Sequence, residues 1–189
     1  IGFVNKMDRQ GADFINVCAQ VKEMLGSHAL PLQLNIGAED GFKGVVDLIN
    51  FRGITWNYAD QVMTFQEIDI PADIIDEATQ LREELLEAVA EFDDNLMEKY
   101  FEDTESLTER EILDALREAT IAGKVVPMMC GSAFKNKGVQ AMLDMVMEIL
   151  PSPLDIEGIK GINPKTDEEV VRKPSVDEPF SALAFKIAT

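Results

Sequence analysis

The chain has 189 residues, of which 46% are hydrophobic, and this is enough for the core of one or two compact units. Its 35 acidic and 17 basic residues give a formal net charge of −18. Because phosphate repels carboxylate, this charge excludes direct DNA or RNA binding by most of the surface and favours a basic protein partner.

The sequence also indicates a cytoplasmic protein and a fragment of a longer one. No apolar run approaches the roughly 20 residues of a membrane span, and the start lacks the pattern of a signal peptide. Cys18 and Cys130 lack the spacing of metal ligands, so we expect two reduced thiols in the core. The chain begins inside an apolar run without Met and stops in another, which we interpret as the limits of a fragment.

The first predicted unit is a strand, a polar turn and a helix. The apolar run 1–4 predicts the strand, and Asn5-Lys6-Met7-Asp8 follows at its carboxyl end. Asp13 can cap a helix that ends at Gly26, since its apolar residues recur with the 3.6-residue period of a helix. These residues are Phe14, Val17, Val21, Met24 and Leu25.

Three short β-rich runs follow, at 30–36, 43–49 and 53–57. Asp40-Gly41 lies between the first two runs, and Gly53 opens the third, which is typical of hairpins. We therefore expect a small antiparallel meander.

From Pro71 the apolar residues recur at helical spacing as far as Leu96, which predicts a long helix. Between Met63 and Glu118 the sequence holds 19 acidic and four basic residues, a net charge of −15. The simpler interpretation is a solvated helical face; the alternative is a docking surface for a basic partner.

A further helix, strand and helix complete this pattern. Thr108-Glu109-Arg110-Glu111 has the sequence of a capping box and opens a helix. The apolar run 124–129 predicts a buried parallel strand, followed by the small polar turn Gly131-Ser132-Ala133. A helix over 139–150 ends at Pro151-Ser152-Pro153. The order of strand, polar turn and helix seen at the start of the chain is thus repeated.

The last part of the chain changes character. Residues 154–178 are rich in Pro, Gly and charge, which predicts a linker. Residues 179–189 alternate apolar and other residues, with Phe180 to Ala188 as the alternating run, and predict the first strand of a following β domain.

The polar turn at residues 5–8 suits guanine, because open α/β sheets bind ligands at the carboxyl ends of their strands. The carboxylate of Asp8 can accept two parallel hydrogen bonds from the ring N–H and the amino group, a donor pair that adenine lacks. The stem of Lys6 can lie along the base or ribose, and the amide of Asn5 can join neighbouring loops. The alternative is an ordinary polar turn between strand and helix.

The second polar turn can supply what guanine further requires, a backbone N–H at its carbonyl O6. The small residues Gly131-Ser132-Ala133 would let the main chain approach the base edge; the alternative is a loop with a Ser cap. Asp8 and Ser132 lie 124 positions apart, whereas a strand-helix-strand crossover needs only ~30 residues. About 90 residues are therefore expected to form an inserted subdomain.

These segments resemble a known family. The two turns are similar to the fourth and fifth guanine-recognition boxes of translational GTPases, and the second is closely similar to the elongation factor G family. That family carries an insert between the two boxes, as class II release factors do, so the equivalent part of a release factor-type GTPase is the alternative. The resemblance covers essentially the whole chain and is carried by Asn5 to Asp8, Gly37 to Leu48, Gly131 to Gln140, Leu150 to Asp155 and Glu178 to Lys186.

The resemblance implies an α/β fold with part of the sheet of a P-loop GTPase domain (G domain), an inserted α+β subdomain and the first strand of a β-barrel. It places the G-domain parts at 1–27 and 123–153 and the insert at 28–122. It places the linker at 154–178 and the barrel strand at 179–189.

The resemblance also implies roles for the residues of the two turns. It gives Asp8 the bidentate contact to guanine, Lys6 the packing against base and ribose, and Asn5 the bracing of the loops. It gives Ser132 and Ala133 the support of Asp8 and the contact to O6. The full expected guanine-binding set is Asn5, Lys6, Met7, Asp8, Gly131, Ser132, Ala133 and Phe134.

For function, the resemblance implies a GTPase that promotes ribosomal translocation during translation elongation, with GTP or GDP as ligand and the ribosome as partner. These 189 residues hold neither G-x-x-x-x-G-K-[ST] nor Asp-x-Pro-Gly-His. We therefore expect Mg²⁺ to be held by regions outside them, no catalytic residue among them, and no activity of this piece alone. His28, the single histidine, is expected in a loop.

The resemblance further suggests the ribosomal stalk protein as the partner of the acidic insert. The expected docking residues are Arg82, Glu83, Glu87 and Glu91, on the exposed side of the long helix.

Overall fold

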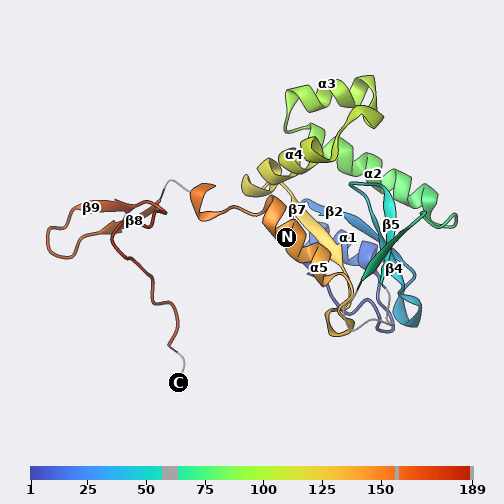
Figure 1. Cartoon of the computed structure of the whole chain (residues 1–189), viewed down its shortest axis with the longest axis horizontal. Helices are drawn as coiled ribbons and strands as arrows, with labels where there is room; N and C mark the ends of the chain where they lie inside the picture. The colour runs from blue at the N-terminus through green and yellow to red at the C-terminus, as the bar shows by residue number, and fades with distance from the viewer. Residues whose placement is uncertain (57–63, 156–157, 188–189) are drawn as a thin grey trace. The chain divides into compact units, whose positions relative to one another are not determined.

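The computed structural model describes residues 1–56, 64–155 and 158–187 of the chain. It contains two compact units, Ile1–Leu150 and Pro151–Thr189 (Figure 1). None of the helices in the described residues has the length and apolar composition needed to cross a membrane.

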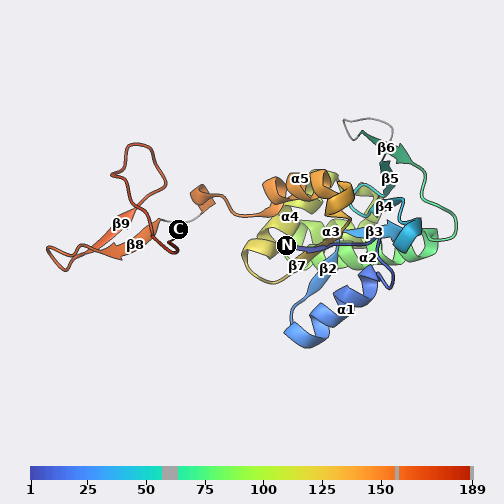
Figure 2. The same cartoon turned by 90° about the horizontal axis from the view of Figure 1, so that it is seen from below.

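A three-stranded parallel sheet lies at the centre of the first unit. Its strands are β1 (Gly2–Val4), β7 (Val126–Cys130) and β2 (Ala29–Pro31), in that spatial order. Because β1 and β7 run parallel as neighbours, the turns that follow them leave the sheet at the same edge. Figure 2 shows α1 (Phe14–Leu25) and α5 (Val139–Ile149) on opposite faces of this sheet.

The ends of α1 follow the local sequence signals. The carboxylate of Asp13 accepts a hydrogen bond of 2.9 Å from the backbone N–H of Asn16 and caps the first turn. Gly26 ends the helix with a φ of 61°, in the left-handed region that glycine adopts readily. The predicted strand, turn and helix at the start of the chain are confirmed.

An antiparallel sheet follows, in the order β3 (Gln33–Ile36), β4 (Gly44–Asp47), β5 (Arg52–Trp56) and β6 (Phe65–Ile68). The meander is confirmed, but β6 was not predicted because its four residues are exposed and show no apolar face. Asn57, the expected end of the third run, lies outside the described residues.

The run 30–36, predicted as one strand, is divided between the two sheets. Its first part, β2, pairs with β7, and its second part, β3, pairs with β4. Leu32 lies at the division: its N–H donates to the carbonyl of Met128 at 2.9 Å, and its carbonyl accepts from the N–H of Leu48 at 3.1 Å. The expected domain boundary at residue 28 therefore does not coincide with a boundary between the sheets.

The acidic segment forms three helices, α2 (Ile75–Ala90), α3 (Asp94–Glu102) and α4 (Glu109–Ile121). The single long helix predicted through Leu96 is wrong, because the carboxylate of Asp93 accepts from the N–H groups of Asn95 and Leu96 and starts a new helix. The capping box of Thr108 and Glu111 is confirmed. Short 3₁₀ turns lie at η1 (Glu39–Gly41), η2 (Thr104–Ser106), η3 (Ala133–Lys135) and η4 (Pro153–Asp155).

The main core joins the expected insert to the expected G-domain parts. Leu48 from the meander, Leu85 and Leu116 from the acidic helices, and Ile149 from α5 are fully buried in one cluster. A second cluster beneath α1 contains Cys18 and Cys130, which are free and buried as expected. Burial raises the pKa of Cys18 to about 11.

The second unit differs from the predicted linker and strand. Residues 154–178, expected to be irregular, contain a hairpin of β8 (Ile159–Ile162) and β9 (Glu169–Arg172). The chain reverses between the strands in a turn in which the N–H of Asp167 donates to the carbonyl of Asn163 at 2.9 Å. Residues 179–187 form no strand, because alternation alone does not supply a hydrogen-bonding neighbour. Residues 188 and 189 lie outside the described part of the chain.

Candidate nucleotide-binding site

Two turns meet at one edge of the parallel sheet: the β1 turn (residues 5–8) and the β7 turn (residues 131–135). The N–H of Gly131 donates to the carbonyl of Val4 at 3.0 Å, and the N–H of Met7 donates to the carbonyl of Gly131 at 3.0 Å. These bonds continue the pairing of β1 with β7 beyond the strand ends. The structure therefore assembles the two segments that are 124 positions apart in sequence.

Asn5 links the two turns through its side chain. Its Oδ1 accepts from the backbone N–H of Lys6 at 2.8 Å and from that of Ala133 at 2.9 Å. The next residue, Lys6, has a φ of 65°, and its side chain is exposed at this edge. Asn5 thus occupies the position of a brace between loops, as its chemistry predicts.

The side chain of Met7 points away from this edge and into the core. Its side chain is 1% exposed and belongs to the core cluster beneath α1, so it anchors the β1 turn and presents only its backbone at the surface. The carbonyl of Met7 accepts from the N–H of Glu39 at 2.9 Å. The side chain of Met7, which was expected in the site, is therefore buried and cannot contact a ligand.

Asp8 lies between polar partners from the β7 turn. The hydroxyl of the buried Ser132 hydrogen bonds its carboxylate, and the Lys135 ammonium lies 3.0 Å from its Oδ2. These two groups, Ser132 first, hold the pKa of Asp8 at about 2, so the carboxylate is ionised at neutral pH and can only accept hydrogen bonds.

The β7 turn closes on itself immediately after these residues. The N–H of Ser132 donates to the carbonyl of Lys137 at 3.0 Å, and the N–H of Lys137 donates back at 2.9 Å. A Cβ on Gly131 would lie 2.3 Å from that Lys137 carbonyl and 2.7 Å from Cζ of Phe3. The small size of Gly131 is thus required by the closed turn and the neighbouring strand, which is a different reason from the predicted approach to a base. Phe134 is 99% exposed at the tip.

Three residues outside the expected guanine-binding set support the site. Lys135 reaches Asp8, and Lys137, which is 4% exposed, donates from Nζ to the carbonyl of Phe42. Burial lowers the pKa of Lys137, and the Asp8 carboxylate opposes that shift. Glu39 accepts through Oε1 from the N–H of Gly11 at 2.7 Å. The only sequence signal for these residues was their place inside the two segments, 37–48 and 131–140, that carry the family resemblance.

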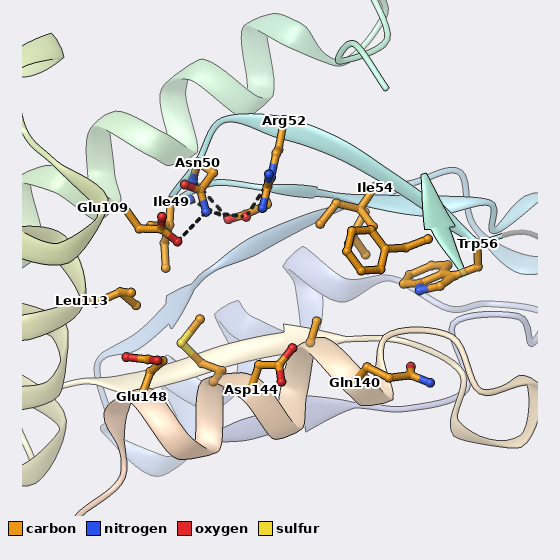
Figure 3. Close-up of a pocket in the computed structure, with 15 residues that line it drawn as sticks. Ile49, Asn50, Arg52, Ile54, Trp56, Glu109, Leu113, Gln140, Asp144 and Glu148 are labelled. Atoms are coloured by element: carbon orange, nitrogen blue, oxygen red, sulfur yellow. Dashed lines mark hydrogen bonds and ion pairs between the residues drawn. The ribbon is translucent and has the colours of Figure 1, made fainter. Parts of the chain in front are cut away.

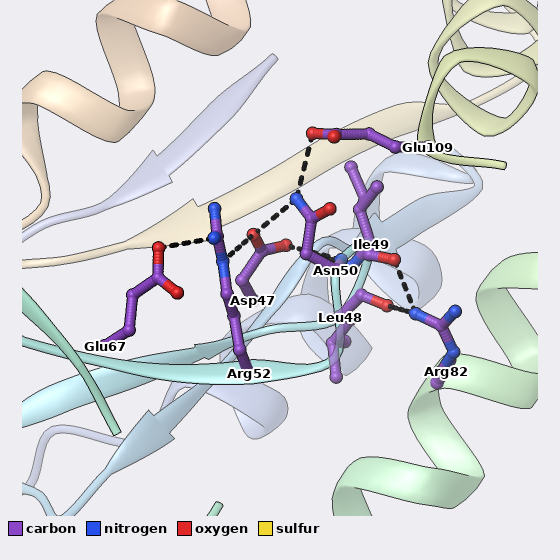
Figure 4. Close-up of polar contacts among 8 residues, drawn as sticks. All are labelled: Asp47, Leu48, Ile49, Asn50, Arg52, Glu67, Arg82 and Glu109. Atoms are coloured by element: carbon purple, nitrogen blue, oxygen red, sulfur yellow. Dashed lines mark hydrogen bonds and ion pairs between the residues drawn. The ribbon is translucent and has the colours of Figure 1, made fainter. Parts of the chain in front are cut away.

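The expected docking face on α2 is only partly as predicted. Glu83, Glu87 and Glu91 are exposed, but Arg82 is half-buried and turns towards the loop between β4 and β5 (Figure 4). Its Nη1 donates to the carbonyls of Leu48 and Ile49, both at 2.5 Å. Arg82 therefore joins α2 to the antiparallel sheet, and the prediction that it lies on the exposed side of the helix was wrong.

The described residues contain no group of three or more His, Cys, Asp and Glu side chains that could hold a metal ion. His28 is an exposed loop residue, as predicted, whose carbonyl accepts from the N–H of Val126 at 2.8 Å.

Parallel strands that carry two such joined turns at their carboxyl ends define a class of α/β nucleotide-binding domain. The sequence profile described as "Elongation factor Tu GTP binding domain" matches residues 1–152, and the chain belongs to this family. The α/β fold and the resemblance to a translational GTPase are thereby confirmed.

The chain is also similar to individual proteins. It is 68% identical over all 189 residues to Elongation factor G of Cytophaga hutchinsonii and 53% identical to Elongation factor G of Amoebophilus asiaticus. In both cases it spans 27% of the relative's length, about a quarter. A crystal structure from Thermus thermophilus superposes with a TM-score of 0.69 at 27% identity, covering 81% of this chain and 22% of that one. The resemblance to elongation factor G is confirmed, and neither curated relative is a release factor.

Proposed function

We propose that this chain is the guanine-recognising part of a GTPase that promotes ribosomal translocation, with GTP or GDP as ligand and the ribosome as partner of the full-length protein. The observation that carries the proposal is the joining of the β1 and β7 turns through Asn5, with the ionised Asp8 between them. Membership in the GTP-binding family and the 68% identity to an Elongation factor G support it.

The chemistry of the turns fits guanine. A carboxylate offers about four lone-pair sites, so Asp8 can keep Ser132 and Lys135 and still accept two hydrogen bonds from the base. The N–H of Ala133 already donates to Oδ1 of Asn5, so a contact to O6 requires this N–H to be shared between two acceptors.

The decisive test is Asp8→Asn in the full-length protein, with equilibrium binding of GDP and of xanthosine diphosphate measured in parallel. The amide replaces one acceptor with a donor, so the affinity for GDP is expected to fall on the order of 100-fold, while the affinity for xanthosine diphosphate is expected to rise. Asp13→Asn, at the cap of α1, is the matched control and should leave both affinities unchanged. Unchanged GDP affinity in Asp8→Asn would exclude the proposed role.

For the 189-residue piece we infer no GTP hydrolysis and weak guanine-nucleotide binding. The phosphate-binding and water-positioning motifs are not in its sequence, and most of the affinity and all of the catalysis depend on charges placed around the phosphates. Calorimetry with GDP tests this directly, and a Kd in the micromolar range or tighter would contradict it.

A second function, docking of the ribosomal stalk protein on the insert, is favoured by the exposed face of α2. Glu83 and Glu87 of α2 and Glu91 at its C-cap recur there at four-residue spacing and so lie on one side of the helix. Titration of stalk protein should show binding at low salt that weakens as salt is added. The absence of binding at low salt would remove this proposal.

Substitution of these glutamates tests whether their negative charge is needed for docking. Replacing the three glutamates of α2 by Gln should weaken the docking. Removing the same charge from the second unit, with Glu168→Gln, Asp177→Asn and Glu178→Gln, should leave it unchanged. Equal effects of the two triple variants would point to net charge and exclude a specific surface on α2.

A further inference from the structure

A pocket of about 300 Å³ lies between the antiparallel sheet and helices α4 and α5, within the first unit (Figure 3). Ile54, Trp56 and Phe65 form its wall on the strands, and Leu113 and Met145 form its wall on the helices. This volume is at the lower end for sites that bind small molecules. The pocket is separate from the β1 and β7 turns and from the exposed glutamates of α2, because none of those residues lines it.

The charged residues that line the pocket are mostly acidic. They are four carboxylates against one guanidinium, that of Arg52. The positive charge of Arg52 is already paired, since its Nη1 donates to Oε1 of Glu67 at 2.5 Å and its Nε lies 3.7 Å from Oδ2 of Asp47. The carboxylate of Glu148 is paired with Arg110 at 3.0 Å. The pocket lining therefore contains two further carboxylates, those of Glu109 and Asp144.

Glu109 and Asp144 have no cation as partner among the described residues. Glu109 accepts a hydrogen bond of 2.9 Å from Nδ2 of Asn50, which leaves its charge uncompensated. Asp144 makes no hydrogen bond or ion pair with any residue in the described part of the chain, and Figure 3 shows it pointing from α5 into the space below Ile54. An apolar hollow with an unpaired carboxylate at its edge is suited to a ligand that combines the opposite charge with an apolar body.

We propose that this pocket binds a small amphipathic cation, with an aromatic or aliphatic body between the sheet and α5 and one protonated nitrogen at the Asp144 carboxylate. Burial of the body between Ile54 and Met145 supplies the apolar contribution. Asp144 and Glu109 supply the charge selectivity, because a ligand of negative charge would be repelled in a chain of net charge −18.

The chain provides its own reporter for a test. Trp56 is the single tryptophan and lines the pocket, so its fluorescence responds to what binds there. The probes are phenethylamine and 3-phenylpropionate, which share the ring and the two-carbon stem and carry opposite charges. Phenethylamine should produce a saturable change that weakens at high salt, and 3-phenylpropionate should produce none.

Variants locate the binding. Asp144→Asn should lower the affinity for phenethylamine about fivefold, which is the size of effect expected for a partly exposed ion pair. Glu118→Gln, which removes the same charge from an exposed position of α4 outside the pocket, should change the affinity less than twofold. Ala141→Phe should fill the space and abolish binding, with its thermal unfolding measured to confirm that it is folded.

Several results would overturn the proposal. These are equal binding of the two probes, binding of neither, or an Asp144→Asn variant that binds as the parent does. If Ala141→Phe fails to fold, shifts of the Leu113 and Met145 methyl resonances in the parent decide whether phenethylamine occupies this pocket. A capped Phe-Lys dipeptide that binds where phenethylamine does not would assign the pocket to a protein partner and exclude the small ligand.

Discussion

At the scale of the residue, Asp8 is a carboxylate whose charge is stabilised by neighbouring groups of the fold. Its pKa lies at about 2 instead of the ordinary 3.8, through Ser132 and Lys135. A carboxyl with a lowered pKa in the folded state stabilises that state fully above pH 3.8, and the contribution is lost as the pH falls through about 2. The difference in free energy of unfolding between the parent chain and Asp8→Asn should therefore shrink as the pH falls from neutral towards 2.

Urea unfolding at a series of pH values measures this difference, because the Asn variant cannot ionise at position 8. A difference for Asp8→Asn that stays constant from neutral pH to pH 3 would show that Ser132 and Lys135 do not stabilise the ionised carboxylate.

The residues of the site were predictable where the signal is local. Asn5 and Asp8 follow a strand directly, and the order of strand, turn and helix places Ser132 at the same sheet edge, so their proximity follows from topology. Lys137 and Glu39 were not predictable from spacing. Their contacts with Phe42 and Gly11 depend on how the meander packs against the parallel sheet, which no local pattern records.

At the scale of the element, Arg82 joins α2 to the loop between β4 and β5. Its guanidinium donates to two carbonyls and lies 5.3 Å from the centre of the Phe51 ring. Hydrogen bonds from a charged donor exceed neutral ones in strength, so Arg82→Ala should lower the free energy of unfolding by about 2 kcal/mol. Glu83→Ala, at the next and exposed position, should change it by less than roughly 0.5 kcal/mol.

Both variants are compared by urea unfolding under the same conditions. An Arg82→Ala variant as stable as Glu83→Ala would show that the contacts of Arg82 with the β4–β5 loop do not stabilise the fold. Arg82 would then again be a candidate docking residue. This comparison also distinguishes a structural role from a binding role on α2. In the part of the chain that the structure describes, no hydrogen bond joins the exposed Glu83, Glu87 or Glu91 to the sheet.

Element boundaries were predictable where a local residue type marks them. Asp13 and the Thr108 capping box satisfy backbone groups next to them in sequence, and Gly26 adopts the left-handed conformation that ends a helix, so the ends of α1 and the start of α4 were correct. Asp93 carries the same signal, but the apolar pattern across it continues through Leu96 and concealed the division between α2 and α3. The β8–β9 hairpin was missed because its strands are exposed and short.

At the scale of the whole molecule, the spacing of the two turns predicted an insert but not how it is attached. A run of about 90 residues can form a separate unit or extend an existing core, and spacing does not distinguish these cases. Here Leu85 and Leu116 share a core with Met129 of β7 and Ile149 of α5. The residues between the two turns therefore complete the core on which the candidate site rests.

This core ends within α5. The last buried apolar side chain among the described residues is Ile149, and Nη1 of Arg117 donates to the carbonyls of Glu148 and Leu150 at 3.1 and 2.7 Å. A chain that ends at Ser152 keeps all of these groups, so its thermal midpoint, followed by circular dichroism, should lie within roughly 2 °C of the parent. A chain that ends at Met147 loses Ile149 and both carbonyls. Its midpoint should fall on the order of 10 °C, and equal midpoints for the two truncations would show that the core does not depend on the end of α5.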